Sequence, residues 1–153
     1  MRPQHPLCPD FIRLLTRSYR RLTGLPLLDP ALPAAQAARW LYQDAPFCLL
    51  AHDTSPSPVF VYANSVAQRC FGYDWEAFTR LESRLSAEAP NREERQRLLE
   101  AVQRDGFAHG YRGLRIARDG RRFWIEDVSM WNLVDDAGIL HGQAAMYRHW
   151  RDD

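Results

Sequence analysis

The last third of the chain contains three strand-like segments joined by short turns, and this arrangement constrains the fold more than any other feature. Residues 107–117, 121–133 and 139–150 are rich in β-branched and aromatic side chains, which favour strands. The dipeptide Asp119-Gly120 separates the first two segments, and Asp-Gly between such segments is a strong hairpin signal. A second turn, "VDDAG", separates the last two. The sequence therefore predicts three consecutive antiparallel strands.

Two more short apolar segments precede the middle of the chain. Residues 46–53 and 58–63 flank a Ser/Pro-rich turn and read as a hairpin. The stretch "YANSVAQRCFGYDWEAF" follows, with two short helices interrupted at Phe-Gly-Tyr. We expect Asn64 to cap the first helix, Gly72 to permit the break and Asp74 to cap the second helix.

The clearest helix is predicted in "NREERQRLLEAVQRDG", residues 91–106. Asn91 and Glu94 have the spacing of a capping box, which places the start of the helix at Asn91. Charged pairs four residues apart predict a solvated face, and Leu98, Leu99 and Val102 form the buried edge. Two strands, a helical crossover and three antiparallel strands make an α+β fold with one five-stranded antiparallel sheet.

Two helices are predicted before the first strand. Residues 10–24 place apolar side chains on one stripe and arginines on the other, with Asp10 as the predicted N-cap and Gly24 at the end. The second helix covers residues 33–43. We expect residues 1–45 to form a helical extension packed on the domain formed by residues 46–153. The alternative use of the apolar stripe is formation of a dimer.

Composition narrows the classes of function. The formal net charge is +1 without a block of like charges, which predicts no nucleic-acid partner. All 20 basic residues are Arg, so a Schiff-base or phosphate-loop lysine is excluded. Three isolated cysteines make no disulfide framework, and no stretch reaches the ~18 apolar residues that span a membrane. These features predict a cytoplasmic protein with no membrane partner.

The element order and four stretches of sequence resemble the MEKHLA domain family, a group of PAS-like sensory domains. The match covers roughly residues 8–150 and is carried by "YANSVAQRCFGYDWEAF", "LESRLSAEAPNREERQRLL", "GYRGLRIARDGRRFWIEDVSMWNL" and "GQAAMY". The resemblance implies a PAS-like fold and a sensory or regulatory role. The family occurs alone in bacteria and at the C-terminus of plant homeodomain–leucine-zipper factors, whose DNA binding is not carried over. The expected context is therefore a bacterial signalling protein.

No catalytic group, metal site or cofactor is identified. Light-sensing PAS relatives carry a reactive Cys in a stretch that corresponds here to "TRLESRLSA", which has none, so covalent flavin chemistry is not expected. Cys70 is interpreted as a buried structural thiol. Haem-binding relatives place a His on the long helix, and residues 91–106 contain none. The histidines lack metal spacing, and no nucleophile elbow is present, so we expect no enzyme and leave the cofactor unknown.

The resemblance also implies a ligand pocket between the short helices and the sheet. Alignment by the Asp-Gly turn and strand alternation identify a set of pocket-facing residues. They are Tyr111, Arg115, Ile125, Asp127 and Ser129, joined by His141, Gln143 and Tyr147 from the last strand. A bulge near Asp127 would reverse the alternation beyond it. A buried charge needs a partner, so Arg115 and Asp127 are predicted to pair with each other or to anchor a small anionic or polar ligand; the alternative is that both face solvent.

These features predict a non-catalytic sensory domain that binds a small molecule and signals through protein association. The partner is a second copy, giving a homodimer, or a separate regulatory protein. A second hypothesis is a ligand-free interaction module that docks through an apolar outer face of the sheet, namely Leu114, Ile116, Val128 and Met146. A third is a small enzyme that uses Arg115, Asp127 and a nearby His.

Overall fold

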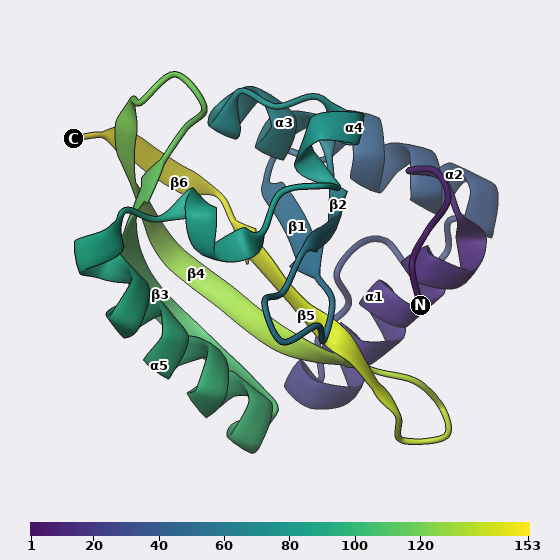
Figure 1. The fold of residues 1–153 in the computed structure, drawn as a ribbon. Helices are drawn as coiled ribbons and strands as arrows, with labels where there is room; N and C mark the ends of the chain where they lie inside the picture. The colour runs from purple at the N-terminus through teal and green to yellow at the C-terminus, as the bar shows by residue number, and fades with distance from the viewer.

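Six antiparallel strands form one sheet in the computed structural model, which describes residues 1–153 (Figure 1). The strand order is β2-β1-β5-β4-β3, and β6 pairs with β4. The strands are β1 (Cys48–His52), β2 (Phe60–Ala63), β3 (Phe107–Ile116), β4 (Arg122–Val134), β5 (Leu140–Tyr147) and β6 (His149–Asp152). The architecture is the α+β class that the sequence predicts, with a helical crossover between β2 and β3.

Helices lie on both faces of this sheet (Figure 1). They are α1 (Pro9–Thr23), α2 (Ala34–Arg39), α3 (Ser65–Phe71), α4 (Trp75–Phe78) and α5 (Ala89–Asp105), with a π-helical turn at Trp40–Asp44 and a 3-10 turn at Ser83–Ser86. Helices α3, α4 and α5 pack on one face, whereas α1 and α2 pack on the other. None of these helices has the combination of length and hydrophobicity that crossing a lipid bilayer requires.

The sheet has six strands instead of five because the last predicted strand divides at Arg148. Its first part, β5, pairs with β1 and with the second half of β4. Its second part, β6, pairs with the first half of β4, where Ile125 faces Trp150 and Glu126 faces His149. The division occurs opposite a bulge at Asp127, the one non-glycine residue with positive φ, at 52°. A bulge bends a strand and increases its twist, and the strand next to β4 divides into β5 and β6 at the same level.

The bulge reverses the alternation of β4, as anticipated for this position. Phe123 and Ile125 are buried on the face that α5 covers, and Val128 and Met130 continue that face beyond the bulge. Trp131 is buried on the opposite face, against α1.

Two of the predicted helix starts are confirmed and two are wrong. The side chain of Asp74 accepts a hydrogen bond from the backbone N–H of Ala77 at 2.8 Å, and Asn64 caps α3. The long helix α5 begins at Ala89 instead of Asn91, and α1 begins at Pro9 instead of after Asp10. Both begin with a proline in the first turn, where the missing N–H costs no helical hydrogen bond.

The side chain of Asn64 also joins three segments. It is fully buried and makes four hydrogen bonds. Its oxygen accepts from the backbone N–H groups of Leu49 and Ala67, both at 3.1 Å. Its amide group donates to the carbonyls of Leu41 at 3.0 Å and Phe47 at 2.9 Å. One carboxamide therefore holds the π-helical turn, β1 and the start of α3 together.

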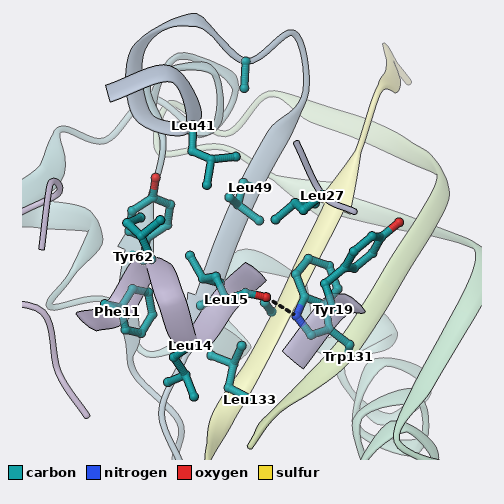
Figure 2. Packing of buried hydrophobic residues seen from close by; sticks show 14 of the residues in the cluster. Phe11, Leu14, Leu15, Tyr19, Leu27, Leu41, Leu49, Tyr62, Trp131 and Leu133 are labelled. Carbon is teal, nitrogen blue, oxygen red and sulfur yellow. Dashed lines mark hydrogen bonds between the residues drawn. The ribbon is translucent and has the colours of Figure 1, made fainter. Parts of the chain in front are cut away.

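Helix α1 covers the outer face of the sheet with an apolar stripe (Figure 2). Leu15 is completely buried, and the ring of Tyr19 meets that of Trp131 edge-on with centroids 4.8 Å apart. The indole N–H of Trp131 donates to the carbonyl of Leu15 at 3.3 Å. The apolar stripe predicted for the first helix therefore packs on this chain's own sheet.

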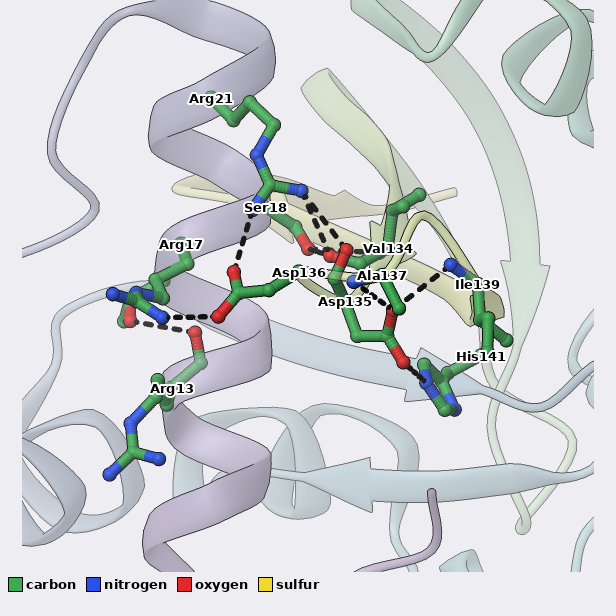
Figure 3. A network of polar contacts seen from close by, with 11 residues as sticks. Arg13, Arg17, Ser18, Arg21, Val134, Asp135, Asp136, Ala137, Ile139 and His141 are labelled. Atoms are coloured by element: carbon green, nitrogen blue, oxygen red, sulfur yellow. Dashed lines mark hydrogen bonds and ion pairs between the residues drawn. The ribbon is translucent and has the colours of Figure 1, made fainter.

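Polar contacts hold α1 against the turn between β4 and β5 (Figure 3). The buried hydroxyl of Ser18 donates to the carbonyl of Val134 at 3.1 Å and accepts from its N–H at 3.0 Å. Arg17 and Arg21 form ion pairs with Asp136 at 2.7 and 3.1 Å. Exposed ion pairs contribute little, so the buried Ser18 contact and the apolar stripe account for most of the attachment.

We expect Leu15→Ala to lower the free energy of unfolding by about 2–5 kcal/mol, because it leaves a cavity between α1 and the sheet. The control is Leu25→Ala in the loop after α1, where the side chain is 57% exposed and the expected change is under about 0.5 kcal/mol. Urea denaturation followed by tryptophan fluorescence measures both. Equal losses in the two variants would contradict the packing described for α1.

Replacing Asn64 by Ala leaves four buried backbone groups without partners. Since each unsatisfied group costs about 1–3 kcal/mol, we expect a loss of stability of at least about 3 kcal/mol. Asp74→Ala removes an exposed cap and should cost only about 1 kcal/mol. The same denaturation experiment compares them, and a cost for Asn64→Ala no larger than that for Asp74→Ala would refute the central role of Asn64.

Candidate functional site

A small cavity lies between α5 and the inner face of the sheet. Its free volume is about 40 Å³, and 12 of its 17 lining residues are hydrophobic. One water needs roughly 10–15 Å³ of such volume, so the cavity has room for a few waters or a very small molecule. The polar lining residues are His52, Ser86, Arg95, Arg115 and Gln143. A mainly apolar cavity with a few converging polar groups is typical of a ligand site.

Most of the residues predicted to face a pocket line this cavity, and three do not. Those that line it are Tyr111, Arg115, Ile125, Gln143 and Tyr147, while their role in binding stays a prediction. Asp127 is exposed on the bulge. Ser129 lies 2.9 Å from the Nδ1 atom of His109 (Oγ to Nδ1), outside the cavity. His141 pairs with Asp135 in the β4–β5 turn (Figure 3).

The predicted pairing of Arg115 with Asp127 is wrong because the bulge turns Asp127 away from the inner face. Arg115 is 6% exposed. Its Nη1 group donates to the carbonyl of Leu114 at 2.9 Å, and its Nη2 group donates to the hydroxyl of Tyr111 at 3.3 Å. The hydroxyl of Tyr111 in turn donates to Glu94 at 3.3 Å. Arg115 therefore has neutral partners and no carboxylate of its own.

Arg95 is a second buried guanidinium in the same cavity, and the sequence reasoning missed it. It extends from α5, is 6% exposed, and forms no hydrogen bond or ion pair within the chain. Burial, and then the positive charge of Arg115, lower the pKa of Arg95 to about 9, so it is protonated at neutral pH. The burial of Arg95 could have been predicted from its spacing. It lies four residues before Leu99 and seven before Val102, which places it on the buried edge of the helix.

Gly113 gives these side chains room. It is buried in β3 opposite Ile125. A Cβ atom at this position would lie 2.8 Å from the Nη1 atom of Arg115 and would also collide with the hydroxyl of Tyr111. The absence of a side chain therefore lets Arg115 and Tyr111 fold back over their own strand.

Two side-chain amides fasten α5 to the sheet beside the cavity. Gln143 donates to the carbonyl of Leu99 at 2.9 Å and to the side-chain oxygen of Asn132 at 3.2 Å. Asn132 donates to the carbonyl of Gln103 at 3.1 Å. The wall of the cavity that carries Arg95 is thus connected directly to β4 and β5.

His52 contributes a neutral ring to the lining. One ring nitrogen, Nδ1, lies 3.0 Å from the carbonyl of Asp53, and the other, Nε2, is buried without a hydrogen-bond partner. Burial lowers the pKa of His52 from its ordinary value of 6.5 to about 4.

The cysteines lie outside the cavity lining. Cys48 and Cys70 are both buried, and the sulfur of Cys70 lies 3.7 Å from the hydroxyl of Tyr147. Burial raises the pKa of the Cys48 thiol. The predicted burial of Cys70 is confirmed. No group of three His, Cys, Asp or Glu side chains is placed to hold a metal ion.

The family model for the MEKHLA domain matches residues 9–152. The chain belongs to the MEKHLA domain family. It is also 24% identical to the homeobox-leucine zipper protein ATHB-14 of Arabidopsis thaliana over 152 residues, which is 97% of this chain and 18% of that protein. This MEKHLA chain thus spans less than a fifth of the length of the curated relative that it matches. That relative is a plant protein, so it does not support the predicted bacterial origin.

Solved structures place the fold of this MEKHLA domain among PAS and light-oxygen-voltage domains. A PAS domain from Colwellia psychrerythraea has a TM-score of 0.63 at 17% identity, covering 77% of this chain and 94% of that one. An RNA-binding light-oxygen-voltage receptor has a TM-score of 0.66 at 24% identity over 82% of this chain and 36% of its own. A fungal light-oxygen-voltage photoreceptor gives 0.58 at 20% identity, over 94% and 92%. The PAS-like fold predicted from the sequence is confirmed.

The lowered pKa of His52 predicts a loss of stability in mild acid. Above pH 6.5 the ring is neutral in both states and contributes nothing. Between pH 6.5 and 4 the unfolded chain binds a proton that the folded protein does not, so stability decreases by roughly 2 kcal/mol at pH 5. Urea denaturation at pH 8 and pH 5 measures the change.

The contribution of His52 is isolated by comparison with His52→Gln, which we expect to lose less stability over this interval. His149→Gln, at an exposed position in β6, is the matched control and should behave as the unchanged protein. If the free energy of unfolding changed with pH in the same way in the unchanged protein and in His52→Gln, the imidazole of His52 would not be held neutral.

Proposed function

We propose that this MEKHLA domain is a sensory module that binds a small molecule in the cavity under α5 and signals by changing its association with a partner. The partner is a second copy or a separate regulatory protein. The observation that carries the proposal is the cavity itself, where the buried Nε2 atom of His52 has no hydrogen-bond partner and the Arg95 guanidinium has no partner within the chain, inside a mainly apolar lining. Buried polar groups of this kind are destabilising unless something satisfies them.

A molecule bound in the cavity would touch elements that also form the surface of the protein. A molecule in it contacts α5 through Arg95 and Leu99, and the sheet through Arg115 and Gln143. Helix α5 is solvated on its other face, so a small displacement of the helix changes the exposed surface. A ligand shifts such an equilibrium only by its difference in affinity for the two positions of α5.

Flavin does not fit this cavity. The names of the neighbouring structures refer to light-oxygen-voltage domains and a flavin analogue. Here the free volume is about 40 Å³, and Phe71, Ile125, Met130 and Tyr147 occupy the inner face. The cavity lining includes no cysteine. We therefore propose a ligand much smaller than a flavin.

The two alternatives have less support. An enzyme using Arg115, Asp127 and a His lacks an assembled site, since Asp127 is outside the cavity. The four apolar residues suggested for an interaction module do not form one exposed face. Val128 lines the cavity, Met146 packs against the cluster under α1, and Leu114 and Ile116 are half-buried. We propose that residues 46–153 carry the cavity and that residues 1–45 cover the outer face.

Comparison of native and denaturing mass spectra of the purified protein tests the proposal. We expect an excess mass in the native spectrum that is released on denaturation. Val128→Leu adds a methylene to the lining and should reduce the bound fraction several-fold, because the free volume is small. Val66→Leu, half-buried in α3 outside the lining, should retain it.

Sedimentation of the loaded and emptied protein then tests signalling. We expect a different state of self-association, or of association with a co-purifying partner, in the two samples. Identical native and denatured masses, with sedimentation the same in Val128→Leu and the unchanged protein, would exclude a ligand-dependent sensor.

A further inference from the structure

Two positive charges face the cavity, and no negative charge faces them. Arg95 from α5 and Arg115 from β3 are each 6% exposed. The cavity lining contains no Asp or Glu. The carboxylate nearest along the hydrogen-bond chain is Glu94, which is exposed and bonds to Tyr111. Burial lowers the pKa of His52 to about 4 and raises the pKa of Tyr147, so both of these lining groups are neutral at pH 7.

An unpaired buried charge is strongly destabilising, and two like charges in one cavity repel each other as well. Folded proteins keep buried charges where a partner compensates them. In this chain Arg115 has two neutral acceptors, the carbonyl of Leu114 and the hydroxyl of Tyr111, and Arg95 has none. The chain itself therefore does not supply the counter-charge that this cavity requires.

The geometry points to a small carboxylate, bound between the guanidinium groups of Arg95 and Arg115, as the ligand of this cavity. This inference rests on the proposed sensory function and names its ligand class. Guanidinium groups bind carboxylates through two parallel hydrogen bonds, which suits two arginines facing one ligand. The remaining lining, including Ile125, Val128 and Met130, suits a short hydrocarbon part. The free volume of about 40 Å³ limits the ligand to a few heavy atoms.

The site is built to hold Arg115 in place. Gly113 leaves the space into which the guanidinium folds, because a Cβ atom there would lie 2.8 Å from its Nη1 atom. The Tyr111 ring also lies under the guanidinium, 5.5 Å from its centre. Arg95 is presented from the opposite wall by α5, which Gln143 and Asn132 fasten to the sheet. The two charges therefore come from elements whose relative position defines the cavity.

The binding experiment uses acetate as the probe and acetamide as its neutral counterpart of the same shape. Both are titrated into the whole chain at constant ionic strength, balanced with sodium gluconate, whose anion is too large for the cavity. Amide and arginine Nε–H signals in ¹H–¹⁵N spectra report binding. We expect saturable chemical-shift changes with acetate at residues lining the cavity. The apparent affinity for acetamide should be at least tenfold lower than that for acetate.

Arg95→Met and Arg115→Met should each weaken acetate binding by about tenfold or more, the range for a lost charged hydrogen bond. Arg97→Met, on the exposed face of the same helix, should bind acetate as the unchanged protein does. Since Arg95 has no partner in the chain, Arg95→Met should also raise the urea midpoint in the absence of acetate. An arginine with a purely structural role would give a lower midpoint.

The outcomes separate this inference from the proposed function. Equal affinity for acetate and acetamide, with Arg95→Met unchanged, would overturn anion recognition and leave a cavity for neutral ligands. Tighter binding of inorganic phosphate than of acetate would overturn the carboxylate class. The absence of any saturable shift, together with no released mass in native spectra, would remove both the carboxylate site and the sensor.

Discussion

The side-chain amide of Asn64 is the interaction on which the arrangement of the elements depends. Its four hydrogen bonds reach the π-helical turn after α2, the strand β1 and the first turn of α3. A carboxamide is one of the few groups that both donates and accepts in one plane, so it can satisfy carbonyls and N–H groups of different segments at once. Because α3 starts from this point, the helices of the crossover begin at a fixed place over the sheet.

The cavity is maintained because contacts beside it hold α5 against the sheet despite the two positive charges that face it. Arg95 and Arg115 are poorly solvated and repel each other, which favours movement of α5 away from the sheet. Leu99 and Val102, with the amides of Gln143 and Asn132, oppose that movement. Packing and hydrogen bonds next to the two charges therefore offset the destabilisation that burying these charges causes.

Local rules predicted much of the fold and part of the site. Asn64, Gly72 and Asp74 were placed correctly because capping depends on neighbours within a few residues. Strand alternation gave the right face for Arg115 and Ile125. It failed for Asp127 and Ser129 because β4 has a bulge against β3, which the sequence could only raise as an alternative, since it depends on pairing with a distant strand. Arg95 was missed because a charged residue on a charged helix looks solvated until the sheet beneath it is known.

The bulge at Asp127 and the division at Arg148 lie at the same level of two paired strands. The sheet is therefore made of two segments joined along a line. Ile125 lies on one side of that line and Val128 on the other, and both line the cavity. A rotation of one segment against the other about this line would change the separation of these two side chains. In such a rotation the displacement would grow with distance from the axis, so the ends of β4 and β6 far from the bulge would move further than the cavity walls.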